Sequence, residues 1–144
     1  MRKELETILV EKYPNLYSRY GGDIRETCMG WGMSCGDGWF QLIDELSQKL
    51  ETLNVVASQV KEKFGGLRFY IEPHDESTYD EVCECISEAE EKSYKICEIC
   101  GKPGELRSGG WLRTTCDKCQ DTIDEGHIPW RNPEMFDQVS TEKI

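Results

Sequence analysis

The sequence predicts an α+β protein in which a small core of helices and a β-hairpin precedes a compact cysteine-rich module. Three observations predict this class. Apolar residues recur at helical spacing in three segments, two β-rich runs are separated by only two glycines, and two C-x2-C pairs lie in the C-terminal third. The 144 residues suffice for one compact core and a small appendix. We expect a core over residues 1–94, a cysteine module over 95–126 and a tail over 127–144.

Three helices are expected in the core. The first covers roughly residues 3–13, because Pro14 disfavours continuation. The second follows Asp37, its expected N-cap, and the third spans residues 75–91, where its many carboxylates form a solvated face. The residues that line one side of each helix at helical spacing are Leu5, Ile8, Leu9 and Tyr13, then Phe40, Ile43, Leu46, Leu50 and Leu53, then Tyr79, Val82, Ile86, Ala89 and Ser93.

A β-hairpin is expected between the second and third helices. Its β-rich runs cover residues 55–64 and 67–72 and are separated by Gly65-Gly66, which predicts a two-residue turn. In that register Lys63 faces Arg68 and Lys61 faces Tyr70, so three cations and a hydroxyl share one face. Like charges across strands are destabilising, which predicts an anion near this face.

Three alternatives account for the basic face of the hairpin. The acidic helix over residues 75–91 could lie across it and neutralise it. An external anion, such as a nucleotide or phosphate, could instead be held by Lys61, Lys63 and Arg68, with Tyr70 as a hydroxyl donor or stacking face. The third alternative is plain exposure to solvent.

A glycine-rich loop precedes the second helix, and its last part, residues 35–39, opens that helix. Free N–H groups there could bind an anion, with Asp37 and Trp39 as contacts. The loop lacks the lysine and serine of a phosphate-binding loop. The alternative is therefore that the glycines permit a turn while Trp31 and Trp39 join the core.

The spacing of Cys97, Cys100, Cys116 and Cys119, with fifteen residues between the two pairs, matches a four-cysteine structural zinc site. The first pair is expected to form a knuckle, the residues between the pairs a hairpin, and the second pair to open a short helix that ends at Gly126. This order predicts a treble-clef module, with a zinc ribbon as the alternative. Four thiolates close the coordination sphere of the ion, so zinc is expected to be structural rather than catalytic.

Basic residues near these cysteines allow two interpretations. They could offset the negative charge of a metal bound by four thiolates. Alternatively, because many treble clefs bind nucleic acid, Trp111 beside Arg113 could stack on a base. The basic residues are Lys95, Lys102, Arg107, Arg113 and Lys118. Cys28 and Cys35 are expected to be buried thiols, since a second metal site would need two further ligands.

The chain is strongly acidic, with 28 acidic and 17 basic residues and a net charge of -11. This charge repels phosphate backbones at long range and disfavours general binding of nucleic acids. The N-terminal segment has no continuous apolar run, which predicts neither a signal peptide nor a membrane span. We therefore expect a soluble cytoplasmic protein, in which C-x2-C pairs among eight cysteines indicate metal binding.

The segment from Glu26-Thr27-Cys28-Met29 to Trp39-Phe40, the run VKEKFGGLRFY over residues 60–70 and the cysteine module resemble, in this order, a family of small uncharacterised proteins common in phages and prophages. The resemblance covers residues 26–119. It implies a phage-encoded protein, for which interference with bacterial defence is a natural hypothesis.

Binding is expected rather than catalysis, because no hydrolase elbow, carboxylate pair or Cys-His dyad is evident from the spacing. The first hypothesis is sequestration of an anionic, nucleotide-like ligand at the basic hairpin face. The second is inhibition of a host defence protein through an acidic surface that imitates nucleic acid. A nucleotide-processing enzyme is the third.

Overall fold

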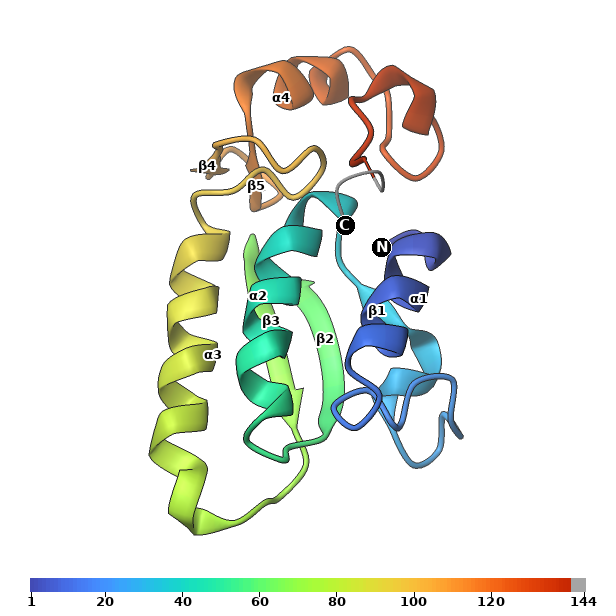
Figure 1. The fold of residues 1–144 in the computed structure, drawn as a ribbon. Coiled ribbons are helices and arrows are strands. Elements are labelled where there is room, and N and C mark those ends of the chain that lie inside the picture. Colours follow the sequence, from blue (N-terminus) through green and yellow to red (C-terminus); the bar gives the residue numbers. More distant parts are fainter. Residues whose placement is uncertain (141–144) are drawn as a thin grey trace.

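The computed structural model describes residues 1–140 and has the predicted α+β class (Figure 1). In chain order the elements are α1 (Lys3–Lys12), a 3-10 turn (Cys28–Trp31), β1 (Met33–Ser34), a 3-10 turn (Asp37–Trp39), α2 (Phe40–Glu51), β2 (Ala57–Lys63), β3 (Gly66–Ile71), a 3-10 turn (Glu76–Thr78), α3 (Tyr79–Ser93), β4 (Glu105–Arg107), β5 (Arg113–Thr115), α4 (Asp117–Asp124) and a 3-10 turn (Pro133–Met135). None of the helices in residues 1–140 is long and apolar enough to cross a bilayer.

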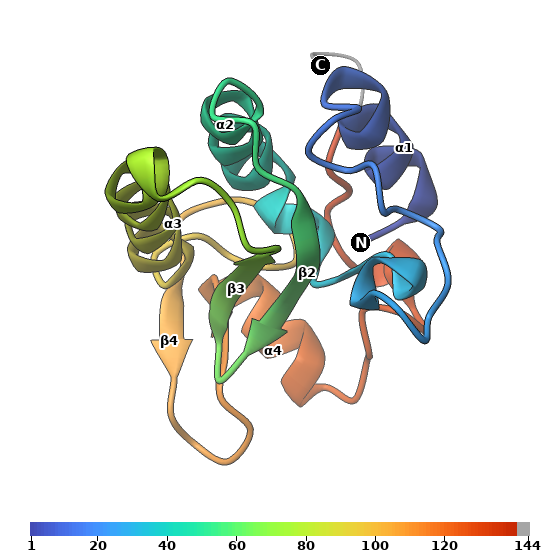
Figure 2. The ribbon, with the colours of Figure 1, turned by 90° about the horizontal axis from the view of Figure 1, so that it is seen from below.

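The core has two layers. One layer is a three-stranded sheet of order β1-β2-β3, in which the short β1 is parallel to β2, and β2 is antiparallel to β3. The other layer consists of α2 and α3, which lie together on one face of the β2–β3 hairpin, with α1 beside α2 (Figure 2). Fully buried side chains between the layers include Leu9, Trp39, Ile43, Leu50, Val60 and Leu67.

The helices follow the predicted apolar pattern, with one difference at the start of α2. The predicted residues from Phe40 to Leu50 are buried and form the core face of α2. Asp37, however, does not cap this helix, because its carboxylate turns to the N-terminal segment: Oδ1 accepts a hydrogen bond from the Arg2 backbone N–H at 2.7 Å, and Oδ2 lies 3.1 Å from Arg2 Nη1. The predicted N-cap is therefore wrong.

The hairpin turn lies one residue earlier than predicted. Lys63 pairs with Gly66, so the central residues of the turn are Phe64 and Gly65, with φ of 55° and 84°. Two central residues with positive φ are typical of the type I′ turn, whose twist matches that of the flanking strands. Lys61 therefore pairs with Arg68. Strand alternation still places the basic side chains on one face, opposite that of Val60 and Phe69.

The cysteine module lies at one end of the core (Figure 1). It consists of a knuckle at residues 97–100, the antiparallel pair β4–β5, and α4, with Cys116 as the N-cap of the helix. Knuckle, hairpin and helix in this order form the predicted treble-clef arrangement. Beyond α4 the chain folds back onto the module, where Phe136 packs against the buried Cys97 and Cys119.

Candidate metal centre and the adjoining cleft

The four predicted cysteines meet in one cluster. Cys97 and Cys119 are buried, Cys100 and Cys116 are half-buried, and all four Sγ atoms lie within 4.8 Å of one another without forming a disulfide. The Sγ atoms of Cys100 and Cys116 are 3.7 Å apart. A tetrahedral ion with metal–sulfur bonds of about 2.3 Å requires about 3.8 Å between sulfurs. The cluster therefore fits a single tetrahedrally coordinated metal ion.

The backbone holds the sulfur atoms in place. In the knuckle the Cys97 N–H donates to the Lys102 carbonyl at 2.7 Å, and the Gly101 N–H donates to the Cys97 carbonyl at 3.0 Å. Gly101 has a φ of 83°, a conformation that glycine adopts without steric cost. At the second pair, the Cys119 N–H points at Cys116 Sγ at 3.4 Å. A thiolate is favoured at this helix N-terminus.

Three of the five predicted cations around the cysteines have carboxylate partners of their own. Lys102 and Lys118 both form ion pairs with Asp137, at 2.9 and 3.1 Å, and the two ammonium groups hold the pKa of that carboxyl below its usual value. Arg107 pairs with Asp117 at 2.8 Å. Arg113 and Lys95 differ: within residues 1–140 neither side chain has a carboxylate within 4.0 Å or a hydrogen-bond acceptor.

The glycine-rich loop binds the knuckle itself. The Gly36 N–H donates to Glu98 Oε2 and the Gly38 N–H to the Glu98 carbonyl, both at 2.7 Å. A Cβ atom on either glycine would overlap backbone atoms of the knuckle. These N–H groups are therefore occupied by the protein's own Glu98, through its carboxyl group at Gly36 and its backbone carbonyl at Gly38.

The two tryptophans assigned to the core differ in environment. Trp39 is fully buried, and its Nε1 donates to the Ile96 carbonyl at 2.9 Å. Trp39 therefore presents no surface to a ligand, and its predicted contact with one is wrong. Trp31 is 70% exposed, which contradicts its predicted place in the core.

The basic face of the hairpin is only partly neutralised by α3. Arg68 contacts Glu90, and its Nη1 also lies 3.4 Å from Tyr94 Oη. Lys61 and Lys63 have no carboxylate within 4.0 Å among residues 1–140. Helix α3 packs on the opposite face of the hairpin. Of the three basic side chains, only that of Arg68, on the edge strand β3, forms an ion pair with α3.

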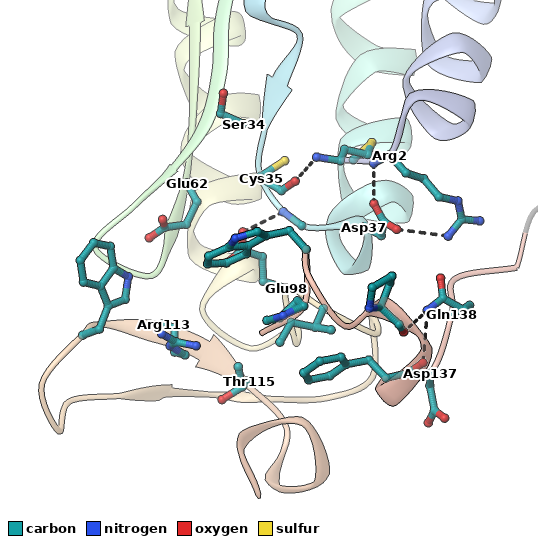
Figure 3. Close-up of a pocket in the computed structure, with 18 residues that line it drawn as sticks. Arg2, Ser34, Cys35, Asp37, Glu62, Glu98, Arg113, Thr115, Asp137 and Gln138 are labelled. Atoms are coloured by element: carbon teal, nitrogen blue, oxygen red, sulfur yellow. Dashed lines mark hydrogen bonds and ion pairs between the residues drawn. The ribbon is translucent and has the colours of Figure 1, made fainter. Parts of the chain in front are cut away.

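A cleft of about 980 Å³ lies between the core, the cysteine module and the chain after α4 (Figure 3). It is lined by Met1, Arg2, Ser34, Cys35, Gly36, Asp37, Glu62, Glu98, Ile99, Trp111, Arg113, Thr115, Pro129, Trp130, Pro133, Phe136, Asp137 and Gln138. Trp111 and Trp130 are 75% and 77% exposed, so large aromatic surfaces border this cleft. Such a volume is in the range of small-molecule sites.

Six charged side chains line the cleft, and three of them, Glu62, Glu98 and Arg113, form no ion pair within residues 1–140. Figure 3 shows Glu62 from β2, Glu98 from the knuckle and Arg113 from β5 around the same space. Glu62 and Glu98 each use Oε2 to accept one backbone N–H, from Gly65 and Gly36, at 2.7 Å. Burial raises the pKa of Glu98 to about 7; the Gly36 hydrogen bond and the nearby Arg113 oppose this shift, and Glu62 adds to it.

Of the ligand contacts predicted from the sequence, only Asp37 lines the cleft. The hairpin residues Lys61, Lys63, Arg68 and Tyr70 do not, and anion binding by them stays a prediction. The cleft residues Glu62, Glu98 and Trp130 carry no local sequence signal. The proximity of Trp111 and Arg113 in the sequence is the one local signal that points to this site, because both residues line the cleft.

The structure adds no second metal site. Within residues 1–140 the tetrad is the only group of three or more His, Cys, Asp or Glu side chains positioned to hold an ion. Cys35 is buried, whereas Cys28 is exposed, contrary to prediction. Comparisons with protein-family models, curated proteins and solved structures gave no match to this chain.

Proposed function

We propose that this is a zinc-containing binding protein that holds a nucleotide-like ligand in the cleft beside the cysteine module. The observation that carries the proposal is the cleft itself, which combines exposed indole rings with charged groups that have unused hydrogen-bonding capacity. Aromatic surfaces stack on nucleobases, and unpaired charges select ligands that supply the missing partners.

Zinc is the proposed ion because four thiolates in tetrahedral geometry favour zinc among the common intracellular metals. A tetrathiolate site has no open position for substrate or water. We therefore assign the ion a structural role and the cleft the binding role. This division supports binding over catalysis.

The resemblance to phage proteins suggests what such binding would achieve. A protein that captures a nucleotide-like signal lowers its free concentration, and an infected cell would then fail to activate the defence that this signal controls. We therefore expect the ligand in the cleft rather than on the basic hairpin face, and the expected ligand remains an anionic, nucleotide-like molecule.

The test is a titration of the zinc-loaded protein with the common ribonucleoside monophosphates, one at a time, followed by tryptophan fluorescence. We expect quenching by at least one of them. Trp111→Ala or Trp130→Ala should weaken binding by about 1–3 kcal/mol, the usual contribution of one stacked base. Trp31→Ala is the matched control, because Trp31 is also 70% exposed but does not line the cleft.

Two outcomes would contradict the proposal. One is the absence of binding by every nucleotide in the series. The other is binding that survives both cleft substitutions but is lost in the double variant Lys61→Ala, Lys63→Ala, which would return the site to the hairpin face.

A second candidate function rests on the acidic face of α3. Its exposed carboxylates are Asp80, Glu81, Glu84, Glu88 and Glu91. A dense row of carboxylates on a helix can imitate a phosphate backbone for a basic host protein. Charge reversal at Glu84, Glu88 and Glu91 tests this function, and unchanged capture of a host partner would count against it.

A further inference from the structure

Three charged side chains of the cleft, Glu62, Glu98 and Arg113, keep unused donors and acceptors. Within residues 1–140 the Arg113 guanidinium forms no hydrogen bond and has no carboxylate within 4.0 Å. Glu62 and Glu98 each bond one backbone N–H through Oε2, while Oε1 of each accepts no hydrogen bond from residues 1–140. A ligand that satisfies these side chains must carry acceptors for Arg113 and donors for Glu62 or Glu98.

We propose that the cleft recognises the guanine base of a free guanine nucleotide. This inference rests on the proposed function. Guanine presents O6 and N7 as adjacent acceptors, which an arginine fork matches in a bidentate manner. On the neighbouring edge N1–H and N2–H2 are adjacent donors, and a carboxylate from Glu62 or Glu98 can accept both. An exposed indole ring of Trp111 or Trp130 supplies the stacking surface.

The other common bases satisfy this set less well. Adenine places an amino group where guanine has O6, so two donors would meet at Arg113, and its N1 is an acceptor that would face a carboxylate. Uracil has one N–H donor between two carbonyl acceptors. Cytosine has an amino donor beside an acceptor nitrogen. A buried polar group left without its partner weakens binding strongly, so these differences select guanine.

The overall charge favours a free nucleotide over a nucleic-acid strand. A strand would bring a continuous row of phosphates toward a protein with a net charge of -11. A mononucleotide brings few charges, and its base can enter the cleft while its phosphate stays in solvent. The proposed ligand is therefore a guanine mononucleotide.

The experiment compares GMP, IMP and AMP by isothermal titration calorimetry. IMP keeps O6, N7 and N1–H but lacks the 2-amino group. We expect GMP to bind about 10-fold tighter than IMP and at least about 10-fold tighter than AMP, the scale of discrimination for a bidentate base contact. Arg113→Lys keeps the charge but loses the fork, and should weaken GMP binding by a similar factor.

Isosteric variants test the carboxylates without disturbing the fold. In Glu62→Gln and Glu98→Gln the amide oxygen can still accept the N–H of Gly65 or Gly36, while the second oxygen becomes an NH2 donor. At least one variant should reduce the preference for GMP over IMP by about 10-fold. Glu105→Gln, an exposed glutamate that does not line the cleft, is the control.

The outcomes separate the two proposals. Equal affinities for GMP, IMP and AMP, all lowered by Trp130→Ala, would overturn the guanine inference and leave the nucleotide-binding function standing. Preference for GMP that neither Gln variant changes would also overturn the inference. Failure of all the nucleotides to bind would overturn both proposals.

Discussion

Gly36 and Gly38 show how single residues join the core to the cysteine module. Each lies against the knuckle so closely that only a hydrogen atom fits on its α-carbon, and each donates its N–H to Glu98. Neither has a positive φ, so the need for glycine here comes from close approach and not from backbone conformation. Glu98 completes the contact and also lines the cleft.

Gly38→Ala is expected to destabilise the protein by about 1–3 kcal/mol, the usual cost of inserting a methyl group into a packed contact. The new Cβ would overlap the Cys97 carbonyl and lie 2.6 Å from Gly101 N, both of them backbone atoms that cannot rotate away. Urea unfolding measures the change in the free energy of unfolding. Gly109→Ala is the control, because no atom lies within 4 Å of its added Cβ. Equal stability of the two variants would contradict the packing argument.

The helices and the cysteine module follow from local signals, whereas the hairpin register does not. Helical periodicity identified the core face of α2, and cysteine spacing identified the tetrad, because each pattern lies within one short segment of the sequence. The hairpin turn was misplaced because Gly65-Gly66 resembles a turn pair by itself. In the structure Gly66 lies in β3 against the ring of Tyr94, and Gly65 lies against Leu106. The contact with the Tyr94 ring therefore favours glycine at position 66, whereas position 65 favours glycine because its φ is 84°.

The cysteine module should depend on its ion. Within residues 1–140 its buried cluster consists of Cys97, Cys119 and Phe136, with Ile99 and Ile123 partly buried against them, which is little apolar surface to hold β4, β5 and α4 in place. We expect the ion to be released by Cys97→Ser, or by chelation of the wild-type protein. The module should then lose its hydrogen-exchange protection while the β2–β3 hairpin is still protected.

Metal analysis and hydrogen exchange by mass spectrometry check this expectation. The control is Cys28→Ser, an exposed cysteine outside the tetrad, which should retain one zinc per chain. Retention of one tightly bound zinc by Cys97→Ser would refute the site. Loss of protection across the core and the module at the same ion concentration would show instead that they unfold as one unit.

The cleft could not be predicted from the sequence because it belongs to no single segment. Its walls come from the N-terminal residues, the end of β2, the knuckle, β5 and the chain after α4. Local patterns predict each of these segments as a loop or a strand, but they do not predict that the segments come together in space. In so acidic a chain the sequence also gives no reason to expect Arg113 to lack an ion pair, and the placement of the carboxylates within residues 1–140 shows that it forms none.

Because the cleft lies between the core and the module, their attachment should control ligand binding. Thr114 carries part of this attachment: its buried hydroxyl donates to the Gly65 carbonyl at the hairpin turn, at 2.7 Å. Thr114→Val keeps the shape of the side chain and leaves that carbonyl without the hydroxyl. We expect the free energy of unfolding to fall by about 1–3 kcal/mol, the usual cost of a buried polar group that loses its partner.

Two probes followed during one urea titration test this coupling. Far-UV circular dichroism reports the core, which contains the long helices α2 and α3, and a zinc-sensitive dye reports the module. For Thr114→Val we expect zinc release at lower urea than the loss of the circular-dichroism signal, together with weaker nucleotide binding. The control is Thr122→Val, whose hydroxyl bonds only within α4, to the Lys118 carbonyl at 3.0 Å. If zinc release and core unfolding occur at the same urea concentration in both variants, the Thr114 hydrogen bond does not hold the module on the core. The attachment then depends on the Glu98 contacts instead.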